Sequence, residues 1–560
     1  MRLFTTLLAA ALLAGCSLPK MIKTVEDINL EVNPSPVVLQ GDEVTIDITG
    51  TFPPKYFAKK VTVAVTPVLV WEGGEAAFET ANYLGEDAAG NGTVVSWENG
   101  KSFSYSAKVP YEAAMKDNAK LELRMSGAQG DKTGEFPAIE LALGVMATQD
   151  MVQPDEKFVI ASDNFQRVMT YVQDVTVNFG YQSSYVNGPE YRDEDWKALK
   201  DLIALAGSAD SVSIVGVATE SYASPEGEIT LNEDLAMDRA KSANKAVAKA
   251  LGRKGIELEE SAVRAMPKGE DWDGFKKAMR ASSIADKDLI LRVLEMYSDK
   301  NKREEEIKNI AKTYKEIEEG ILPDLRRSQV AVTYTVEGYT DEELMDLCKT
   351  NPEALTVEEL LFSATLFEDA NDQLEVYQNT ARVHADDFRG HNNVGVTLMA
   401  LGRMKQAEEA FNAAKSLAAN NGVVNTNLGA IARQNGDTDG ADNYYGKASG
   451  GSELSYNKGV LAITQGEYGR AISSMGNNST ANLALAKILN GDANGARTTL
   501  ENSGDDSAVT SYLLAICAAR LQDAAGVKKH VTDALAKDPT MRDRAQNDLE
   551  FRDYRSALGM

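Results

Sequence analysis

The feature that most constrains this chain is an internal repeat in its C-terminal third. Five positions recur at an offset of thirty-four residues: Gly395, Gly402, Ala407, Phe411 and Ala414 return as Gly429, Gly436, Ala441, Tyr445 and Ala448. The same small, small, Ala, bulky pattern continues at shorter spacing as Gly459, Gly466, Ala471 and Met475, then as Ala484, Gly491, Ala496 and Leu500, and more weakly through Ala515, Val527, Val531, Ala534 and Pro539. Such a unit buries its apolar face only against its neighbours, so the pattern predicts a stacked helical array.

This pattern resembles the tetratricopeptide repeat, whose period is about thirty-four residues and whose small residues let paired helices approach closely. The resemblance covers roughly residues 355–545, inside a region expected to be all-helical over 340–555. It implies a curved solenoid whose concave surface binds a segment of a partner protein. The alternative is an array that only packs against the preceding domain.

The N-terminus has the pattern of an export signal. The first twenty residues, MRLFTTLLAAALLAGCSLPK, combine one basic residue with a short apolar run and a single cysteine. The run is too short to span a bilayer and fits a secretory signal peptide. Leu13-Ala14-Gly15-Cys16 resembles the bacterial lipobox, which implies removal of residues 1–15 and attachment of lipid, palmitate included, at Cys16. Several acyl chains anchor a protein stably, whereas one does so only marginally.

The residues after this cysteine bear on where such a lipoprotein is sorted. Ser17, rather than an aspartate, follows Cys16, which in the bacterial lipoprotein family implies the outer membrane. The stretch Ser17–Lys23 contains no acidic residue, whereas some envelope lineages use an acidic cluster there to export lipoproteins to the cell surface. We therefore expect a lipid anchor in the outer membrane on the periplasmic face, with surface exposure as the alternative.

Charge and cysteine content exclude several classes of function. The chain has 58 Lys and Arg against 84 Asp and Glu, and its net charge of -26 repels nucleic-acid phosphates, so nucleic-acid binding is not expected. Cys348 and Cys517 lie in apolar helical contexts and are predicted to be buried thiols rather than a disulfide. Three scattered histidines and the lack of a CxxC pair predict no metal site, no cofactor and no Ser-His-Asp enzyme.

Residues 16–155 are predicted to form an all-β sandwich. Segments such as GDEVTIDITGTF and AKKVTVAVTPVLVW alternate apolar with polar side chains and are rich in Val and Thr. Gly-rich or Asn-Gly turns in WEGGE, AAGNGT and ENGKS separate these segments, as in an antiparallel sandwich. We interpret this region as a spacer, with an adhesion module as the alternative.

Strands alternate with helices over residues 160–338. The segments VQDVTVNFGYQS, SVSIVGVAT and RRSQVAVTYTV have strand patterns, and LNEDLAMDRAKSANKAVAKALGRKGI predicts a long helix ended by Gly252. The segment DEDWKALKDLIALAGS predicts an amphipathic helix whose apolar side contains Trp196, Leu199, Leu202, Ile203 and Leu205. The alternation predicts an α+β sheet covered by helices on at least one face.

The loop before the long helix carries a second resemblance to a known family. Within SYASPEGEITLNEDLAMDRA, the residues that fall in register with the motif of the OmpA-like, peptidoglycan-associated domain are Tyr222, Ser224, Gly227, Asn232, Leu235 and Arg239-Ala240. Gly269-Glu270 and Arg326-Arg327 match two later positions of that family. The resemblance covers about residues 165–337 and implies an α+β OmpA-like sandwich.

The OmpA-like family binds the diaminopimelate of a peptidoglycan stem peptide, a zwitterion whose carboxylate suits a guanidinium and whose ammonium suits a carboxylate. By this resemblance Arg239 would take the carboxylate, and Asn232, two helical turns away, shares its helix face. The nearby helix N-terminus adds a field that favours an anion. The resemblance therefore predicts a peptidoglycan site formed or flanked by Ser224, Glu226, Asn232, Arg239 and Arg327.

Two departures from the family motif bear on this site. Ser224 stands where the family has Asp, so a ligand ammonium loses its ionic partner, and Glu226 is the candidate replacement across Pro225. The stretch before the final strand is also longer than in a minimal family member. Residues of about 255–322 are predicted to be inserted helices that either present a solvated face or cover the pocket. The alternative for the loop is an ordinary strand-to-helix turn kept as scaffold.

These features predict a multidomain, non-enzymatic scaffold of the outer membrane. It would bind peptidoglycan through the OmpA-like domain and an envelope protein in the groove of the repeats. One alternative is a protein-interaction adaptor of an envelope assembly, secretion or fimbrial machine whose OmpA-like domain no longer binds peptidoglycan. Another is a surface or fimbrial accessory lipoprotein with an adhesive sandwich. The last is a hydrolase using paired carboxylates such as Glu270 and Asp271.

Overall fold

The chain folds into two compact units. The computed structural model describes residues 17–116 and 118–559. One unit combines Met1–Ser162 with Phe367–Met560, and the other is Asp163–Leu366. The N-terminal sheets and most of the helical repeats therefore belong to the same unit, although the second unit separates them in the sequence.

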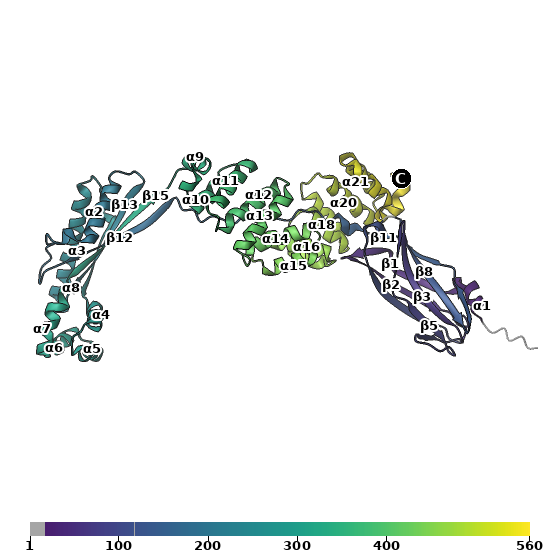
Figure 1. Ribbon diagram of the computed structural model, residues 1–560, viewed down its shortest axis with the longest axis horizontal. Coiled ribbons are helices and arrows are strands. Elements are labelled where there is room, and N and C mark those ends of the chain that lie inside the picture. The colour runs from purple at the N-terminus through teal and green to yellow at the C-terminus, as the bar shows by residue number, and fades with distance from the viewer. Residues whose placement is uncertain (1–16, 117, 560) are drawn as a thin grey trace, which may run out of the picture. The chain divides into compact units, whose positions relative to one another are not determined.

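The N-terminal part of the first unit consists of two β-sheets, drawn purple to blue in Figure 1. Its elements are α1 (Leu18–Lys23), β1 (Asn29–Gln40), β2 (Glu43–Phe52), β3 (Thr62–Trp71), β4 (Gly74–Ala77), β5 (Ala81–Gly85), β6 (Thr93–Val95), β7 (Lys101–Pro110), β8 (Lys120–Gln129), β9 (Lys132–Glu135), β10 (Ile139–Leu143) and β11 (Val145–Met146). One sheet has the order β11-β1-β2-β7, and the other the order β10-β8-β3-β5-β6, with β4 beside β3 and β9 beside β8.

A single apolar core joins the two sheets. Because successive side chains point to opposite faces of a strand, Ile46 and Ile48 of β2 lie in the same buried cluster as Leu121 and Leu123 of β8. The long strands pair antiparallel, whereas β11 on β1 and β6 on β5 are parallel. The sheet-rich N-terminal region predicted from the alternating pattern is therefore present.

The second unit begins with a four-stranded mixed sheet and two helices. Its elements are β12 (Val168–Asn178), α2 (Glu194–Ala206), β13 (Val212–Ala223), α3 (Ile229–Gly252), β14 (Val263–Glu270) and β15 (Arg327–Glu337). The strand order is β12-β15-β13-β14, with β14 parallel to β13 and the other pairs antiparallel. Trp196 and Leu199 of α2 and Val247 of α3 share one core with Val175 and Val330 of the sheet.

Two local predictions in this unit were wrong. Leu205 is 49% exposed, because it follows Ile203 by two residues and so lies roughly 200° around the helix from it. The range 255–322, predicted to be inserted helices, contains the strand β14 before its helices begin. The sequence VRAMPKGE lacks a clear alternation of apolar and polar residues, which explains why this edge strand was missed.

The inserted helices follow β14, and two further helices close the second unit. The insertion consists of α4 (Trp272–Ala281), α5 (Lys287–Met296), α6 (Lys300–Lys308), α7 (Ala311–Gly320) and α8 (Leu322–Leu325). The last two helices of the unit are α9 (Asp341–Thr350) and α10 (Val357–Thr365). The insertion has its own small core, which includes Phe275, Ile290 and Ile317.

The C-terminal part of the first unit is a succession of paired helices, drawn green to yellow in Figure 1. They are α11 (Ala370–Val383), α12 (Phe388–Ala400), α13 (Met404–Leu417), α14 (Gly422–Gln434), α15 (Thr438–Lys447), α16 (Ser452–Thr464), α17 (Tyr468–Met475), α18 (Ala481–Leu489), α19 (Ala493–Glu501), α20 (Ala508–Arg520), α21 (Ala524–Lys537), α22 (Arg542–Asn547) and α23 (Arg555–Leu558). The predicted helical repeats are confirmed.

The repeated small and bulky residues meet inside each helix pair. A Cβ added to Gly395 would lie 2.6 Å from the ring of Phe411, and a Cβ added to Gly429 would lie 2.4 Å from the ring of Tyr445. The small residue of one helix therefore makes room for the bulky residue of the next. Gly436 ends the first helix of its pair with a φ of 82°, a left-handed conformation that glycine adopts without strain.

The two cysteines of the described region are buried. Cys348 lies in α9 and Cys517 in α20, and they do not form a disulfide. Burial raises the pKa of the Cys517 thiol to about 12, which keeps it protonated and unreactive at neutral pH. The prediction of two buried thiols is confirmed.

Within the first unit, the sheets dock directly on the helical array. Gln40 donates a hydrogen bond to the carbonyl of Gly466 (3.2 Å), at the end of β1 and beyond α16. Thr148 donates to the carboxylate of Glu550 (2.6 Å), and both side chains are buried. The predicted sandwich is thus attached to the array by specific contacts.

The close approach of α14 and α15 can be tested by one methyl group. Gly429→Ala places a Cβ against Tyr445, and we expect the free energy of unfolding to fall by about 1–3 kcal/mol, the usual cost of overpacking. The control is Gly446→Ala in α15, where the new Cβ meets open space. It should gain up to about 1 kcal/mol, because Ala restricts the unfolded chain. Urea denaturation followed by circular dichroism measures both, and equal effects of the two substitutions would contradict this packing.

Candidate functional site

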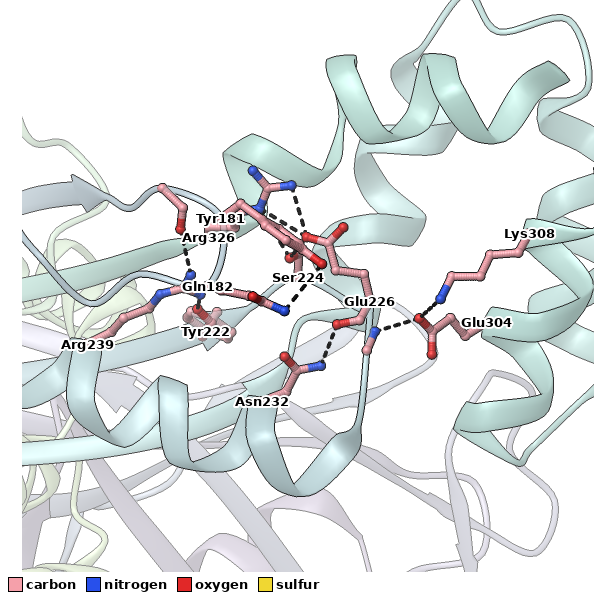
Figure 2. A network of polar contacts seen from close by, with 12 residues as sticks. Tyr181, Gln182, Tyr222, Ser224, Glu226, Asn232, Arg239, Glu304, Lys308 and Arg326 are labelled. Carbon is pink, nitrogen blue, oxygen red and sulfur yellow. Dashed lines mark hydrogen bonds and ion pairs between the residues drawn. The ribbon is translucent and has the colours of Figure 1, made fainter. Parts of the chain in front are cut away.

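The predicted peptidoglycan residues lie around the loop between β13 and α3. Figure 2 shows Ser224 and Glu226 in this loop, Asn232 and Arg239 on α3, and Arg326 just before β15. Ser224, Asn232 and Arg239 are each at most 5% exposed. The fold therefore gathers residues from three separate segments at the end of the sheet where β13 stops.

Glu226 points inward and forms a buried ion pair. Its Oε1 accepts hydrogen bonds from Nε and Nη2 of Arg326 at 3.1 and 2.9 Å, and from the hydroxyl of Ser224 at 2.6 Å (Figure 2). Glu226 is 9% exposed and Arg326 is 8% exposed. The carboxylate proposed as a substitute for the missing Asp is therefore directed into the site, and there it neutralises a guanidinium of the same chain.

Arg239, the predicted carboxylate ligand, is engaged with the backbone. Its Nε donates to the carbonyl of Ser183 (3.0 Å), its Nη1 to that of Tyr222 (2.9 Å) and its Nη2 to that of Gly180 (3.2 Å). The side chain is 1% exposed, and burial together with the nearby charge of Arg326 lowers the pKa of its guanidinium to about 10. A ligand carboxylate would have to replace these carbonyls.

Asn232 and Arg327 also bind groups of the protein itself. Asn232 donates to the backbone carbonyl of Glu226 (3.0 Å) and to Oε1 of Glu270 (3.0 Å), so it fixes the loop to the end of β14. Arg327 donates to Oδ2 of Asp271 (2.7 Å). The structure thus joins four of the five predicted residues around one loop, while Arg327 pairs with the residue that follows β14.

The two acids considered for a hydrolase have structural contacts. Glu270 accepts a second hydrogen bond from the indole of Trp272 (2.8 Å). Asp271 caps α4 by accepting from the backbone N–H of Gly274 (2.7 Å), in addition to its contact with Arg327. Each carboxylate therefore has a local role in holding the start of the insertion, which is the ordinary role of an N-cap acid.

The inserted helices cover the loop. Glu304 of α6 accepts a hydrogen bond from the backbone N–H of Gly227 (2.6 Å) and pairs with Lys308 (2.5 Å), as Figure 2 shows. Outside the insertion, the ring of Tyr181 also covers the ion pair, with its centroid 5.4 Å from the guanidinium of Arg326. The cavity between the loop residue Pro225 and the insertion has a volume of about 10 Å³, which is about one water-sized probe. The insertion therefore closes over the site.

A second site lies along the helical array, where we expected a partner segment. Residues 153–161 of the same chain run past four asparagines, one from each of α12, α14, α16 and α18. Each asparagine accepts from the N–H and donates to the C=O of one residue: Asn482 with Gln153 (2.8 and 2.9 Å), Asn457 with Lys157 (2.7 and 2.8 Å), Asn427 with Val159 (2.7 and 2.8 Å) and Asn393 with Ala161 (2.8 and 3.0 Å). We call these four residues the asparagine ladder.

The ladder matches the chemistry of an extended backbone. A carboxamide has an acceptor oxygen and a donor nitrogen side by side, so it pairs with both groups of one residue. Lys157, Val159 and Ala161 alternate along the segment, because in an extended chain only every second residue faces the same way. The four asparagines are at most 1% exposed. Asn393 and Asn427 are also joined to Asn392 of the array by hydrogen bonds of 3.1 and 2.9 Å, which hold their carboxamides in place.

Side chains of the segment also enter the array. Glu156 forms an ion pair with Arg433, and both are buried. The second oxygen of Glu156 accepts from Gln434 (2.6 Å). Phe158 stacks on Phe411 with ring centroids 5.9 Å apart and planes within 7°. These contacts distinguish the segment from a generic extended chain.

The asparagine ladder was missed in the sequence, although a signal was present. Each asparagine stands two residues before the small residue of its repeat, in the triplets NVG (393–395), NLG (427–429), NKG (457–459) and NLA (482–484). The repeat was recognised from its small and bulky positions, which pack the helices. A polar residue repeated at a fixed distance from them indicates that the helix face carrying it has a shared role along the array.

The family comparison matches the helical part of the chain. Residues 388–421 match the model of the tetratricopeptide repeat family. The C-terminal array contains tetratricopeptide repeats. The curated proteins contain no match to this chain.

Several solved structures are similar to parts of the chain at low identity. A chain of the APC/C hetero-tetramer Cut9-Hcn1 has 16% identity and a TM-score of 0.32, over 37% of this chain and 45% of that chain. PilF of Pseudomonas aeruginosa has 14% identity and a TM-score of 0.29, over 39% of this chain and 99% of that one. A tetratricopeptide repeat protein from Parabacteroides merdae has 14% identity and a TM-score of 0.29, over 44% and 97%. This chain thus spans less than half of the first of these structures.

Two further observations concern metals and membranes. Within residues 17–116 and 118–559, His, Cys, Asp and Glu side chains form no group of three that is placed to hold a metal ion. Among the helices of this described part, none has the length and apolar character needed to cross a membrane. Cys16 and the signal sequence 1–15 lie outside the described residues, so lipid attachment stays a prediction.

The Glu226–Arg326 pair can be tested by removing its anion. We expect Glu226→Ala to lower the free energy of unfolding of the second unit by about 3–5 kcal/mol, because a buried guanidinium is left without a counter-charge. The control Glu228→Ala, at an exposed position of the same loop, should change stability by less than about 0.5 kcal/mol. Chemical denaturation measures both, and a small effect of Glu226→Ala would show that the pair is solvated.

The asparagine ladder can be tested by proteolysis. Lys157 is exposed and trypsin cleaves after it, but its backbone is bound to Asn457. We expect Asn457→Ala to accelerate this cleavage roughly tenfold or more, since losing a buried hydrogen-bond partner costs about 1–3 kcal/mol and raises the open population accordingly. The control Asn412→Ala removes an exposed asparagine of α13. Mass spectrometry of the fragments over time gives both rates, and equal rates would contradict the ladder.

Proposed function

We propose that this protein is a non-enzymatic adaptor of the bacterial envelope, anchored in the outer membrane through lipid on Cys16. Its tetratricopeptide repeats hold a protein segment in extended conformation, and its OmpA-like domain serves as scaffold. The observation that carries this proposal is the asparagine ladder, in which Asn393, Asn427, Asn457 and Asn482 each bind one residue of an extended chain. Repeat proteins use such extended surfaces for binding other chains.

The ladder supports binding of protein rather than of another ligand. Paired N–H and C=O groups at every second residue are a property of extended polypeptide, and main-chain hydrogen bonds with side-chain pockets are a recurring mode of peptide recognition. Beside the ladder, the array also binds the carboxylate of Glu156 through the buried Arg433 and the ring of Phe158 through Phe411. Backbone groups therefore set the register of the bound segment, and these two side-chain contacts add selectivity.

Peptidoglycan binding is the second candidate, favoured by the convergence of Ser224, Glu226, Asn232 and Arg239 on one loop. To take a zwitterionic stem peptide, this site must release Arg239 from its three carbonyls and separate Glu226 from Arg326. Both changes would leave buried charged groups without their partners, which is unfavourable in free energy. The closed geometry therefore favours the adaptor over the peptidoglycan binder.

Co-sedimentation with purified peptidoglycan sacculi separates the two candidates. The adaptor predicts that the soluble chain lacking residues 1–16 stays in the supernatant at the level of an unrelated control protein. Pelleting that is lost in Arg239→Ala but kept in the neighbouring exposed variant Lys241→Ala would instead establish the peptidoglycan site. Circular dichroism of each variant checks that its fold is intact.

The anchor is tested by metabolic labelling with a palmitate analogue in a bacterial host. We expect label on the full chain and none on Cys16→Ala, with the variant moving from the membrane fraction to the soluble fraction, because the acyl chains supply the membrane affinity. Ser17→Ala keeps the cysteine and serves as the control. Equal labelling of all three chains would refute lipid attachment at Cys16.

A further inference from the structure

The segment 153–161 occupies the groove in the manner of a ligand. It meets the array through backbone groups and through the side chains of Asp155, Glu156 and Phe158, and Nζ of Lys157 lies 4.9 Å from the centroid of the Tyr456 ring. Pro154, Lys157 and Ile160 are exposed. Pro154, which has no N–H, stands at a position that the ladder does not bind. An external chain could therefore make the same contacts, provided that it lacks proline at the four bound positions.

The array selects an acidic residue at the position of Glu156. Arg433 is 9% exposed and pairs with Glu156, which is 6% exposed. A buried guanidinium without a carboxylate is strongly disfavoured, so a segment with a neutral residue at this position would bind poorly. Asp155 adds a second acidic contact, because its carboxylate accepts from the hydroxyl of Tyr456 (2.5 Å) and from Asn482 (2.6 Å).

The array selects an aromatic residue two positions after that acid. Phe158 lies parallel to Phe411, itself fully buried between its paired helices. Phe411 is the bulky residue that packs against Gly395. The face of this ring that meets Phe158 is therefore presented by a rigid part of the repeat, and a flat apolar side chain is the best match to it.

From these contacts we propose that residues 153–161 are an in-cis occupant of the groove, and that the groove takes from a partner protein an extended segment of the same chemistry, Asp-Glu-x-aromatic. This rests on the proposed adaptor function and names its ligand class. A tethered occupant has an effective concentration on the order of millimolar, so it competes strongly with any external segment. Residues 153–161, which we call the linker, thereby set the minimum affinity that a partner segment needs in order to displace them.

The test uses a fluorescent peptide with the sequence of residues 151–163, MVQPDEKFVIASD, and the chain lacking residues 1–16. In the linker variant Glu156→Gln/Phe158→Ala, the in-cis occupant loses its two selective contacts while the array is untouched. We expect fluorescence anisotropy to show that this variant binds the peptide at least tenfold more tightly than the unaltered chain. The control Ile160→Ala changes an exposed residue of the same segment and should bind like the unaltered chain.

The specificity is tested on the same linker variant. A peptide carrying the Glu-to-Gln and Phe-to-Ala changes should bind at least tenfold more weakly than the original peptide, and adding Arg433→Gln to the protein should remove the preference for the acid. Equal binding of the two peptides, or a folded linker variant that binds no better than the unaltered chain, would overturn the proposal. Neither outcome depends on sacculus binding, so failure here is distinct from failure of the adaptor function.

A further measurement requires no change to the protein. Millimolar peptide with Gln in place of its own lysine should displace the linker and accelerate tryptic cleavage at Lys157 of the unaltered chain, whereas the peptide with altered Glu and Phe positions should not. Acceleration by both peptides, or by neither, would overturn the proposal.

Discussion

Hydrogen bonds between four buried asparagine carboxamides and the backbone of residues 153–161 determine how the first unit is assembled. They join positions as far apart in sequence as Gln153 and Asn482. Because the segment follows the N-terminal sheets directly, this pairing also fixes the sheets beside the array, where Thr148 and Glu550 make a buried contact. The second unit, Asp163–Leu366, is consequently an excursion between two parts of one folded body.

The two candidate sites differ in how readily the groups of the same chain that occupy them can be replaced by a ligand. At the loop between β13 and α3, opposite charges are buried together, and Arg239 is held by carbonyls of the neighbouring loop. Opening that site would separate buried charges, which the protein interior opposes. Along the array, the ladder binds neutral amides that any extended chain supplies, and an acidic residue of an incoming segment can restore the buried pair with Arg433. Exchange of one chain segment for another therefore restores the same contacts, whereas ligand entry at the loop separates Glu226 from Arg326.

Much of the architecture was predictable because it depends on short-range patterns. The small and bulky positions of the repeat follow from helix packing and are visible at a fixed offset, and the β-rich N-terminus follows from alternation. Glu226 was predicted as the candidate replacement for the missing Asp, but its pairing with Arg326, a hundred residues away, depends on tertiary structure. The strand β14 was missed because its sequence lacks alternation, and the occupant of the groove was missed because residues 153–161 carry no repeat signal.

The asparagine ladder was not predicted for a related reason. Asn457 and its equivalents are not among the small and bulky positions on which the repeat assignment was based. Their function becomes visible only when an extended chain lies along the array, because a carboxamide can then pair with both the N–H and the C=O of one residue.

Amide hydrogen exchange measured residue by residue along 153–161 tests the central claim most directly. If the asparagine ladder binds the segment as described, the amides of Lys157, Val159 and Ala161 exchange slowly, and those of Glu156, Phe158 and Ile160, which lie between them, exchange markedly faster. This alternation follows from the ladder alone. Uniformly fast exchange across the segment would contradict the account, because it would show that the linker does not occupy the array in solution.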